Sequence, residues 1–172
     1  MENLKTLIDE KKLHNRIEEI AAQIEKEYQN KEITLICILK GSVFFTVELA
    51  KKINGDVRLE FIRVSSYGEG TQSTGEIKMK LDLKDSIRGK NIIVVEDIID
   101  TGRTLSYLIE YLKMKKPSSL KLCALLDKPE RRIKKVDVDY TGFQIPDKFV
   151  VGYGLDWNEK YRNLPYIAYI EQ

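Results

Sequence analysis

Cysteine and histidine are scarce in this sequence of 172 residues, which has two cysteines and a single histidine. A structural zinc site uses about four such ligands at short spacings, and Cys37, Cys123 and His14 offer no such spacing. Both cysteines lie in apolar runs, so we expect small core side chains in a reducing compartment and not a disulfide bond. Zinc domains and disulfide-rich scaffolds are therefore excluded.

Long apolar runs and a strong charge of one sign are also missing. The net charge is +2, so bulk electrostatics favour neither nucleic acid nor an anionic membrane as a partner. No run approaches the roughly 20 apolar residues that a transmembrane helix needs, and the first residues lack the apolar core of a signal peptide. We therefore expect a cytoplasmic protein that binds neither nucleic acid nor membrane.

The remaining composition is that of a globular protein, with 42% hydrophobic and 33% charged residues. The length fits one domain with a substantial core. Because no repeat, low-complexity tract or linker divides the chain, we expect residues 1–172 to form a single domain.

Apolar runs alternate with helical patterns along the chain. Residues 33–39, 92–95 and 120–126 are apolar runs typical of strands buried on both faces. Asp9 is a candidate N-cap for a helix whose apolar stripe ends at Tyr28. Further strands are expected at residues 57–64, 77–83, 136–143, 149–154 and 166–170, and further helices at 43–53 and from the candidate N-cap Thr104 onward. This order predicts an α/β fold with a mainly parallel sheet flanked by helices.

Residues 91–105 combine a buried strand, two acids, a short loop and a helix start. Glu96 and Asp97 follow the strand, and residues 100–104 (Asp-Thr-Gly-Arg-Thr) form a loop rich in hydroxyls. Free N–H groups and the helix dipole converge at such a helix start and favour an anion. The adjacent carboxylates indicate that the anion comes with a hard cation such as Mg²⁺. An ordinary loop with helix-capping carboxylates is the simpler alternative.

The same segment resembles a known family motif. Val-Val-Glu-Asp-Ile-Ile-Asp-Thr-Gly-Arg-Thr-Leu, residues 94–105, is similar to the ribose-pyrophosphate loop of type I phosphoribosyltransferases, especially the hypoxanthine-guanine branch. A second match covers residues 145–165, where Trp157 replaces a more common tyrosine. The resemblance spans nearly the whole chain from Leu13 and implies the type I phosphoribosyltransferase fold. Its small hood would come from the N-terminal segment and roughly residues 137–172.

The family motifs imply roles for the other loops that follow strands. Lys40 and Gly41 resemble the pyrophosphate loop, in which the backbone of these two residues would bind pyrophosphate and the Leu39–Lys40 peptide would be cis. Arg162 would bind the same group. Residues 65–75 resemble the flexible catalytic loop, with Ser66, Tyr67, Ser73, Thr74 and Gly75 in place. Such a lid would exclude water from a reactive cationic sugar.

The resemblance also implies the purine contacts. Lys128 would donate to the exocyclic oxygen of a 6-oxopurine, because an ammonium offers only donors. Phe149 would stack on the base, and the backbone of Phe149 and Val150 would bind its edge. Asp156 would lie near the base and a second magnesium ion. Without the family, Lys128, Arg131 and Arg132 would all be interpreted as solvated charges, and the latter two keep that interpretation.

Taken together, the resemblance implies a purine-salvage enzyme. It would transfer the 5-phosphoribosyl group from 5-phosphoribosyl-1-pyrophosphate to N9 of hypoxanthine or guanine, giving IMP or GMP and pyrophosphate. Asp100 would be the proton acceptor for N7. Mg²⁺ would be held by Glu96, Asp97 and Asp156, and the ribose and 5′-phosphate by residues of one loop: Glu96, Asp97, Asp100, Thr101, Gly102, Arg103 and Thr104. A homodimer or homotetramer is expected.

Two alternatives use the same fold. An RNA-binding regulator of pyrimidine genes would keep the ribose-phosphate loop but should show a basic face, which the small net charge does not favour. An adenine-specific enzyme would give no reason for Lys128. The sequence does not rank hypoxanthine, guanine and xanthine.

Overall fold

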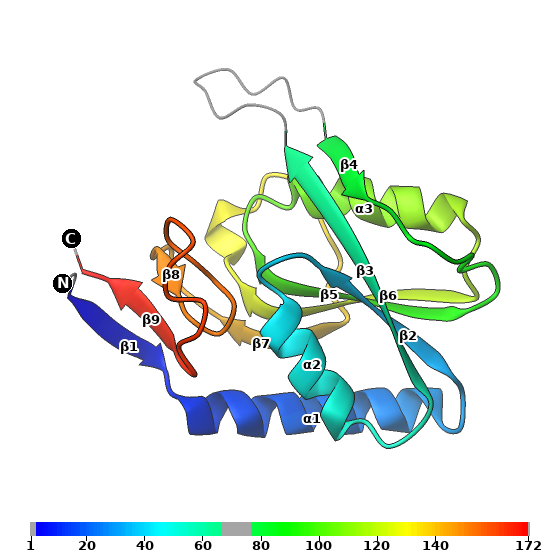
Figure 1. The fold of residues 1–172 in the computed structure, drawn as a ribbon, viewed down its shortest axis with the longest axis horizontal. Coiled ribbons are helices and arrows are strands. Elements are labelled where there is room, and N and C mark those ends of the chain that lie inside the picture. The colour runs from blue at the N-terminus through cyan, green and yellow to red at the C-terminus, as the bar shows by residue number, and fades with distance from the viewer. Residues whose placement is uncertain (1–2, 67–76, 172) are drawn as a thin grey trace.

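The computed structural model describes residues 3–66 and 77–171 (Figure 1). The predicted catalytic loop falls largely outside these residues. Tyr67, Ser73, Thr74 and Gly75 are not described, and Ser66 is described only by its backbone, as the last residue of a strand.

The elements follow the alternating order that the sequence predicts. They are β1 (Leu4–Ile8), α1 (Glu10–Tyr28), β2 (Ile33–Ile38), α2 (Val43–Lys52), β3 (Val57–Ser66), β4 (Ile77–Leu81), β5 (Asn91–Ile99), α3 (Arg103–Met114), β6 (Ser119–Asp127), a 3₁₀ turn η1 (Pro129–Arg131), β7 (Tyr140–Gln144), β8 (Val150–Val151) and β9 (Ile167–Ile170). Among the described residues, no helix is long and apolar enough to span a membrane.

The main sheet has six strands in the order β4-β3-β2-β5-β6-β7. The neighbours from β3 to β7 are all parallel, and only β4 runs antiparallel, at one edge. This confirms the predicted α/β fold with a mainly parallel sheet.

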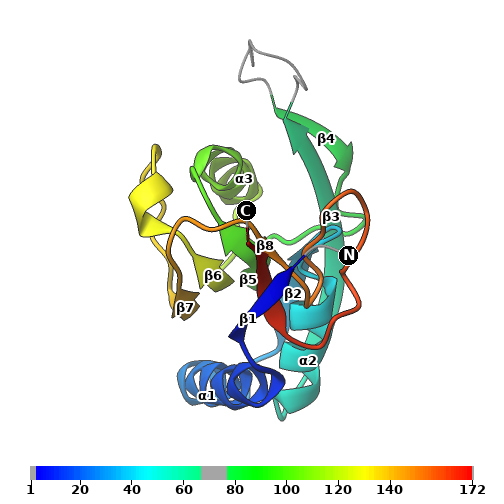
Figure 2. The same ribbon diagram turned by 90° about the vertical axis from the view of Figure 1, so that its left-hand side faces the viewer.

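Helices cover both faces of this sheet, α1 and α2 on one and α3 on the other (Figure 2). The burial of β5 follows from this layering, because successive side chains of a strand point to opposite faces. Ile92 and Val94 pack in a buried cluster with α3, whereas Ile93 and Val95 pack in the cluster with α1 and α2. The continuous apolar run therefore indicates a strand buried on both sides.

The strand order reverses between β2 and β5. From β2 the chain crosses through α2 to β3, and from β5 it crosses through α3 to β6 on the opposite side. Ligands of open α/β sheets bind beyond the carboxyl ends of the strands at such a reversal. The loops after β2 and β5 begin there, and they contain residues 39–42 and 100–102.

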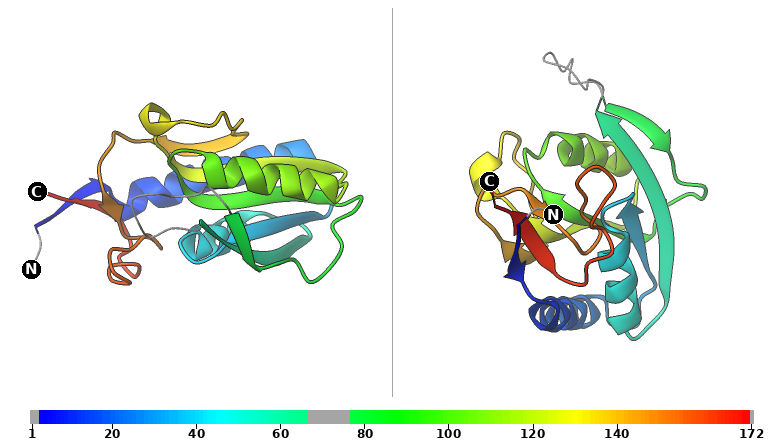
Figure 3. Two further views of the ribbon diagram at one scale, coloured as in Figure 1. Left: turned by 90° about the horizontal axis from the view of Figure 1, so that it is seen from above. Right: turned by 60° about the vertical axis from the view of Figure 1, so that its left-hand side comes forward.

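A second, three-stranded antiparallel sheet has the order β1-β9-β8. Leu4 pairs with Ile170, so the two ends of the described chain lie side by side at one end of the molecule (Figure 3). Strand β1 is missing from the prediction because only Ile8 of its five residues is buried and its partner strand is more than 150 residues away in the sequence.

The two predicted helix caps have different outcomes. Asp9 is confirmed as the cap of α1, since its Oδ1 accepts from the backbone N of Lys12 at 2.9 Å. The predicted cap Thr104 is wrong, because α3 already begins at Arg103. Its N-cap is Gly102, with φ of +78°, a left-handed conformation that glycine adopts without steric cost.

Candidate active site

A cleft of about 580 Å³ lies at the carboxyl edge of the main sheet, between the sheet and the small sheet's strand β8. It brings together residues predicted from four separate segments of the sequence. The predicted residues in its lining are Lys40, Gly41, Asp97, Asp100, Lys128, Phe149, Val150, Asp156 and Arg162. Glu96 and the loop from Thr101 to Thr104 are adjacent in the chain but do not line this cleft.

Gly41 packs directly against the side chain of Asp97. A Cβ atom at Gly41 would stand 1.6 Å from Oδ2 of Asp97, and one at Gly154 would stand 2.0 Å from the carbonyl oxygen of Gly41. The Leu39–Lys40 peptide before it is cis, as the resemblance implies. The loop after β2 is therefore held between the acid of β5 and the segment that follows β8.

Glu96 and Asp97 lie within the last part of β5, which continues to Ile99. Each carboxylate accepts a backbone N–H of its own strand: Asp97 N donates to Glu96 Oε1 (3.1 Å) and Ile98 N to Asp97 Oδ1 (2.7 Å). Burial, together with the charge of Asp97, raises the pKa of Glu96 well above its usual range, and burial also raises the pKa of Asp97.

Such a pair of desolvated carboxylates suits a divalent cation. Among the described residues, no group of three or more acidic, histidine or cysteine side chains is arranged around a metal site. Mg²⁺ commonly uses one or two carboxylates and completes its shell with water and substrate phosphates. The residues present therefore fit a magnesium ion that binds together with a phosphorylated substrate.

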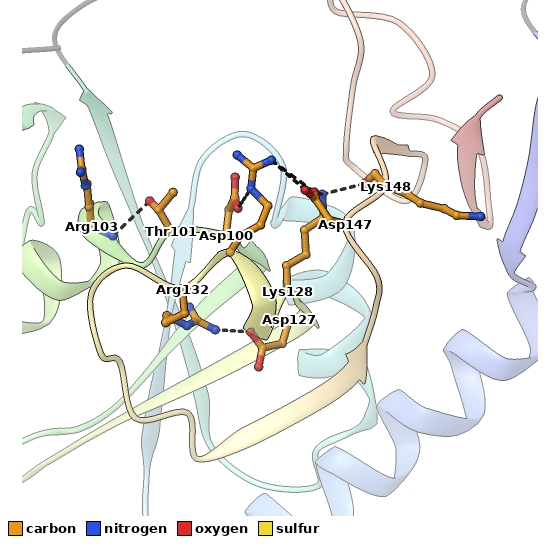
Figure 4. A network of polar contacts seen from close by, with 9 residues as sticks. Asp100, Thr101, Arg103, Asp127, Lys128, Arg132, Asp147 and Lys148 are labelled. Carbon is orange, nitrogen blue, oxygen red and sulfur yellow. Dashed lines mark hydrogen bonds and ion pairs between the residues drawn. The ribbon is translucent and has the colours of Figure 1, made fainter. Parts of the chain in front are cut away.

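Asp100 faces a cation. Arg131 Nε lies 2.6 Å from Asp100 Oδ1, and Arg131 Nη1 lies 3.3 Å from each carboxylate oxygen of Asp147. Figure 4 shows Asp100 and Asp147 on opposite sides of the guanidinium group that joins them. Arg131 also lines the cleft; its side chain stays 45% exposed, as a solvated charge should, but its two acidic partners were not predicted.

Arg132, in contrast, is not a solvated charge. Its guanidinium contacts the carboxylate of Asp127, and both side chains are largely buried. This pair joins the end of β6 to the segment that follows η1.

Lys128 is buried, and its ammonium group enters the cleft from the end of β6. Nζ donates to the carbonyl oxygen of Lys148 at 2.6 Å and lies 3.4 Å from Asp147 Oδ1 (Figure 4). An ammonium has three protons, so one donor remains for a ligand. Phe149, the residue after Lys148, also lines the cleft and is 53% exposed.

Thr101 and Gly102 lead into α3, whose first residues are Arg103 and Thr104. Arg103 N lies 3.5 Å from Thr101 Oγ1, and the carbonyl oxygen of Thr101 accepts the N–H groups of Ile133 and Lys134. The first N–H groups of a helix lack partners within the helix and attract an anion. The geometry is that of an anion site at the start of α3.

Arg162 and Lys40 converge on the remaining wall of the cleft. Arg162 Nη1 donates to Gly154 O at 2.7 Å, and Nη2 lies 2.8 Å from Asp156 Oδ1. Its Nε is buried without a hydrogen-bond partner among the described residues. Glu159 contacts both cations, with its Oε2 3.0 Å from Lys40 Nζ.

Arg131, Asp147 and Glu159 are the functional candidates that sequence reasoning misses. A usable signal exists for Arg131, because residues three apart in a 3₁₀ turn lie above one another, and Arg131 is three residues after Lys128. Asp147 carries no comparable signal, since Lys128 and Arg131 are 16 or more residues away in the sequence. Glu159 lies three residues before Arg162, but its contact with the distant Lys40 has no signal in the sequence.

Comparisons with known proteins agree with this geometry. Residues 4–158 match the phosphoribosyl transferase domain family. The chain is 45% identical over 167 residues to the hypoxanthine-guanine phosphoribosyltransferase of Bacillus subtilis, a match that covers 97% of this chain and 93% of that protein. A crystal structure of a hypoxanthine-guanine phosphoribosyltransferase from Bacillus anthracis superposes with a TM-score of 0.93 at 50% identity, covering 98% of this chain and 100% of that one.

A longer relative contains the same unit as one part. The bifunctional protein TilS/HprT of Listeria monocytogenes is 46% identical over 167 residues, which are 97% of this chain but only 26% of that protein. The family match covers most of the chain, and the fold is the one that its motifs predict. The chain belongs to the phosphoribosyltransferase family, with the type I phosphoribosyltransferase fold.

Proposed function

We propose that the protein is a purine-salvage enzyme that transfers the 5-phosphoribosyl group from 5-phosphoribosyl-1-pyrophosphate to N9 of hypoxanthine or guanine. The products are IMP or GMP and pyrophosphate. The single observation that carries this proposal is the cleft that joins Asp100, Lys128, Phe149 and Arg162 next to the helix start of α3. The relatives described above, which are named for this activity, support it.

The leaving group and the sugar are handled by the loops after β2 and β5. Lys40, Gly41 and Arg162 stabilise the pyrophosphate as negative charge develops on it. The helix start at Thr101 to Thr104 holds the 5′-phosphate. Glu96 and Asp97 bind the ribose hydroxyls, directly or through magnesium, and so orient the donor.

Magnesium accompanies the donor in this proposal. Glu96, Asp97 and Asp156 are the residues that hold it, and when bound it neutralises charge on the pyrophosphate. The desolvated pair on β5 supports this assignment.

Residues on the opposite side of the cleft bind the purine base. Asp100 accepts the N7 proton, which makes N9 the better nucleophile. Lys128 directs its remaining proton at O6, and Phe149 stacks on the ring. The small sheet with β8 acts as the hood over the base. The relatives named above give no support to an RNA-binding regulator.

We also propose a homodimer or homotetramer. Val47 and Ala50 of α2 and Val57 and Leu59 of β3 line one shallow apolar hollow on the surface. Strand β3 has no partner on its outer side before Arg63 within the described sheet. An apolar surface beside an open strand edge is a typical contact for a second copy.

Steady-state assays with 5-phosphoribosyl-1-pyrophosphate, magnesium and four separate bases test the activity. Hypoxanthine or guanine should give the nucleotide and one equivalent of pyrophosphate. The rate with xanthine, the third 6-oxopurine, is compared with these two. Adenine should react poorly. Failure of hypoxanthine, guanine and xanthine alike would overturn the proposal.

A further inference from the structure

The side chains of Lys40 and Arg162, two residues assigned to pyrophosphate, share one acidic partner. Lys40 Nζ lies 3.1 Å and 3.0 Å from the two carboxylate oxygens of Glu159, and Arg162 Nη2 lies 3.4 Å from its Oε1. Lys40 follows β2, whereas Glu159 and Arg162 follow β8, so the carboxylate bridges two distant parts of the chain. It occupies the position between the two cations.

The backbone around Glu159 presents this carboxylate. Trp157 and Lys160 are joined by a pair of backbone hydrogen bonds of 3.1 and 3.0 Å, and the two residues between them, Asn158 and Glu159, have φ of +52° and +60°. This is the hairpin turn in which Asn-Gly is the preferred pair. A glutamate at the glycine position is unfavourable for the backbone, which points to a use for its side chain.

The backbone of Glu159 is hydrogen-bonded to the protein, whereas its side chain is exposed to solvent. Its backbone N donates to Asp156 Oδ2 at 2.8 Å, so the turn is fixed to the wall of the cleft. Its side chain is 65% exposed, and that of Lys40 is 48% exposed. An anion from solution can therefore reach the Lys40 ammonium at the place where Glu159 contacts it.

The chemistry of the contact is that of a phosphate site. Lysine and arginine bind carboxylate and phosphate oxygens with the same charge-assisted hydrogen bonds. The hydrogen bond from Lys40 lowers the pKa of Glu159, so the carboxylate is ionised at neutral pH. Glu159 and a diphosphate consequently compete for the same two cations.

We propose that Glu159 is a positioning residue that holds Lys40 and Arg162 in the free protein and must release them before diphosphate binds. This inference rests on the proposed function, which assigns the residues Lys40 and Arg162 to the diphosphate, and it adds the ammonium group of Lys40 to the backbone contact of that residue. Its consequence is weaker binding of diphosphate, and hence faster loss of the pyrophosphate product, than the two cations alone would give.

Calorimetric titration of the full chain with magnesium pyrophosphate tests the inference. Glu159→Gln keeps the shape and the backbone conformation but removes the charge, and it should bind pyrophosphate about three- to tenfold more tightly, the range expected for two exposed ion pairs. Pyrophosphate should inhibit its nucleotide synthesis at correspondingly lower concentration. The gain should shrink at high salt, because exposed charges are screened.

Two further variants provide the controls. Glu159→Asp keeps the charge on a shorter side chain and should stay near the wild type, and Glu130→Gln removes an exposed acid of η1 that does not contact Lys40. A merely structural role of Glu159 would leave binding unchanged or weaken it. Unchanged or weaker binding by a folded Glu159→Gln protein, as judged by circular dichroism, would overturn the inference.

The proposed function fails by a different measurement. If the wild type makes no nucleotide from hypoxanthine, guanine or xanthine, the proposed function is wrong whatever the titration shows. If the wild type is active and Glu159→Gln binds pyrophosphate no more tightly, only the role of Glu159 is wrong.

Discussion

The carboxylate of Asp100 lies 2.6 Å from Nε of Arg131, and this contact decides how a substitution there is interpreted. Asp100→Asn removes the proton acceptor and also the ion pair. We expect kcat to fall by roughly 10²–10⁴-fold, the usual contribution of general-base catalysis, while the protein stays folded. The measurement is single-turnover formation of the nucleotide.

Arg131→Gln is the matched control for Asp100→Asn, since it breaks the same ion pair but keeps the carboxylate. Its loss of kcat should be far smaller, and Asp85→Asn, an exposed acid outside the cleft, should behave as the wild type. Equal losses in Asp100→Asn and Arg131→Gln would assign the effect to the ion pair and remove Asp100 from proton transfer.

Lys128 is the residue on which base selection should depend. Its buried ammonium offers donors only, so the 6-amino group of adenine would leave both groups unpaired in a partly desolvated site. We expect Lys128→Ala to lower the ratio of kcat/KM for hypoxanthine over adenine by roughly 5- to 150-fold, corresponding to about 1–3 kcal/mol.

The ratio of two substrates is measured on one protein, so a loss of stability in Lys128→Ala cancels from it. Lys128→Met, which keeps more of the buried volume, should lower the ratio as well, and the exposed Lys134→Ala should not. Efficient use of adenine by the wild type would contradict the substrate class while leaving the ribose-phosphate site intact.

At the scale of elements, the segment after β8 is locked against the loop after β2 at Gly154. Gly154 has a φ of +101°, and a Cβ added to it would stand 2.0 Å from Gly41 O. Gly154→Ala should therefore displace the Lys40–Gly41 loop and weaken pyrophosphate binding by at least about tenfold, since misplaced binding groups cost that much or more. Titration with pyrophosphate measures the effect.

Gly89→Ala is the control that separates the effect of backbone strain from the effect of a steric clash with Gly41. Gly89 also has positive φ, +72°, but no atom lies within 4 Å of an added Cβ. Both variants should lose thermal stability, and only Gly154→Ala should lose pyrophosphate affinity. Equal pyrophosphate affinity in the two variants would show that the contact with Gly41 does not position the loop.

Elements that are determined by neighbouring residues were predicted, whereas those that depend on distant residues were not. Residues 33–39 and 120–126 are confirmed as strands because burial on both faces leaves an unbroken apolar run. The N-cap of α3 is mispredicted at Thr104, since the left-handed Gly102 caps the helix two residues earlier. Strand β1 and the contacts of Arg131 are missed because their partners come from remote segments.

The sequence predicted residues that line the cleft but not the ion pairs between them. Family motifs name Lys40, Lys128 and Arg162 from short runs of sequence, and parallel strands bring such runs to one edge. The ion pairs that join them, through Glu159 and Asp147, depend on side-chain positions that no local pattern encodes.

At the scale of the whole molecule, the apolar hollow between α2 and β3 is the surface we assign to a second copy. Val47 is 44% exposed and Leu59 40%, and Phe61, two residues further along the same side of β3, is 39% exposed. The hollow adjoins the part of β3 before Arg63 that has no outer partner in the described sheet. Such an edge promotes association unless it is covered.

Light scattering coupled to size-exclusion chromatography should thus give a mass of at least twice the 20.0 kDa of the chain. Val47→Glu combined with Leu59→Lys places charges in the hollow, where burial without partners is costly, and should shift the protein to monomer with unchanged circular dichroism. Ile133→Lys, which removes another exposed apolar side chain outside the hollow, should not change the mass. A wild type that stays monomeric at every concentration would show that this apolar face is not an interface between copies.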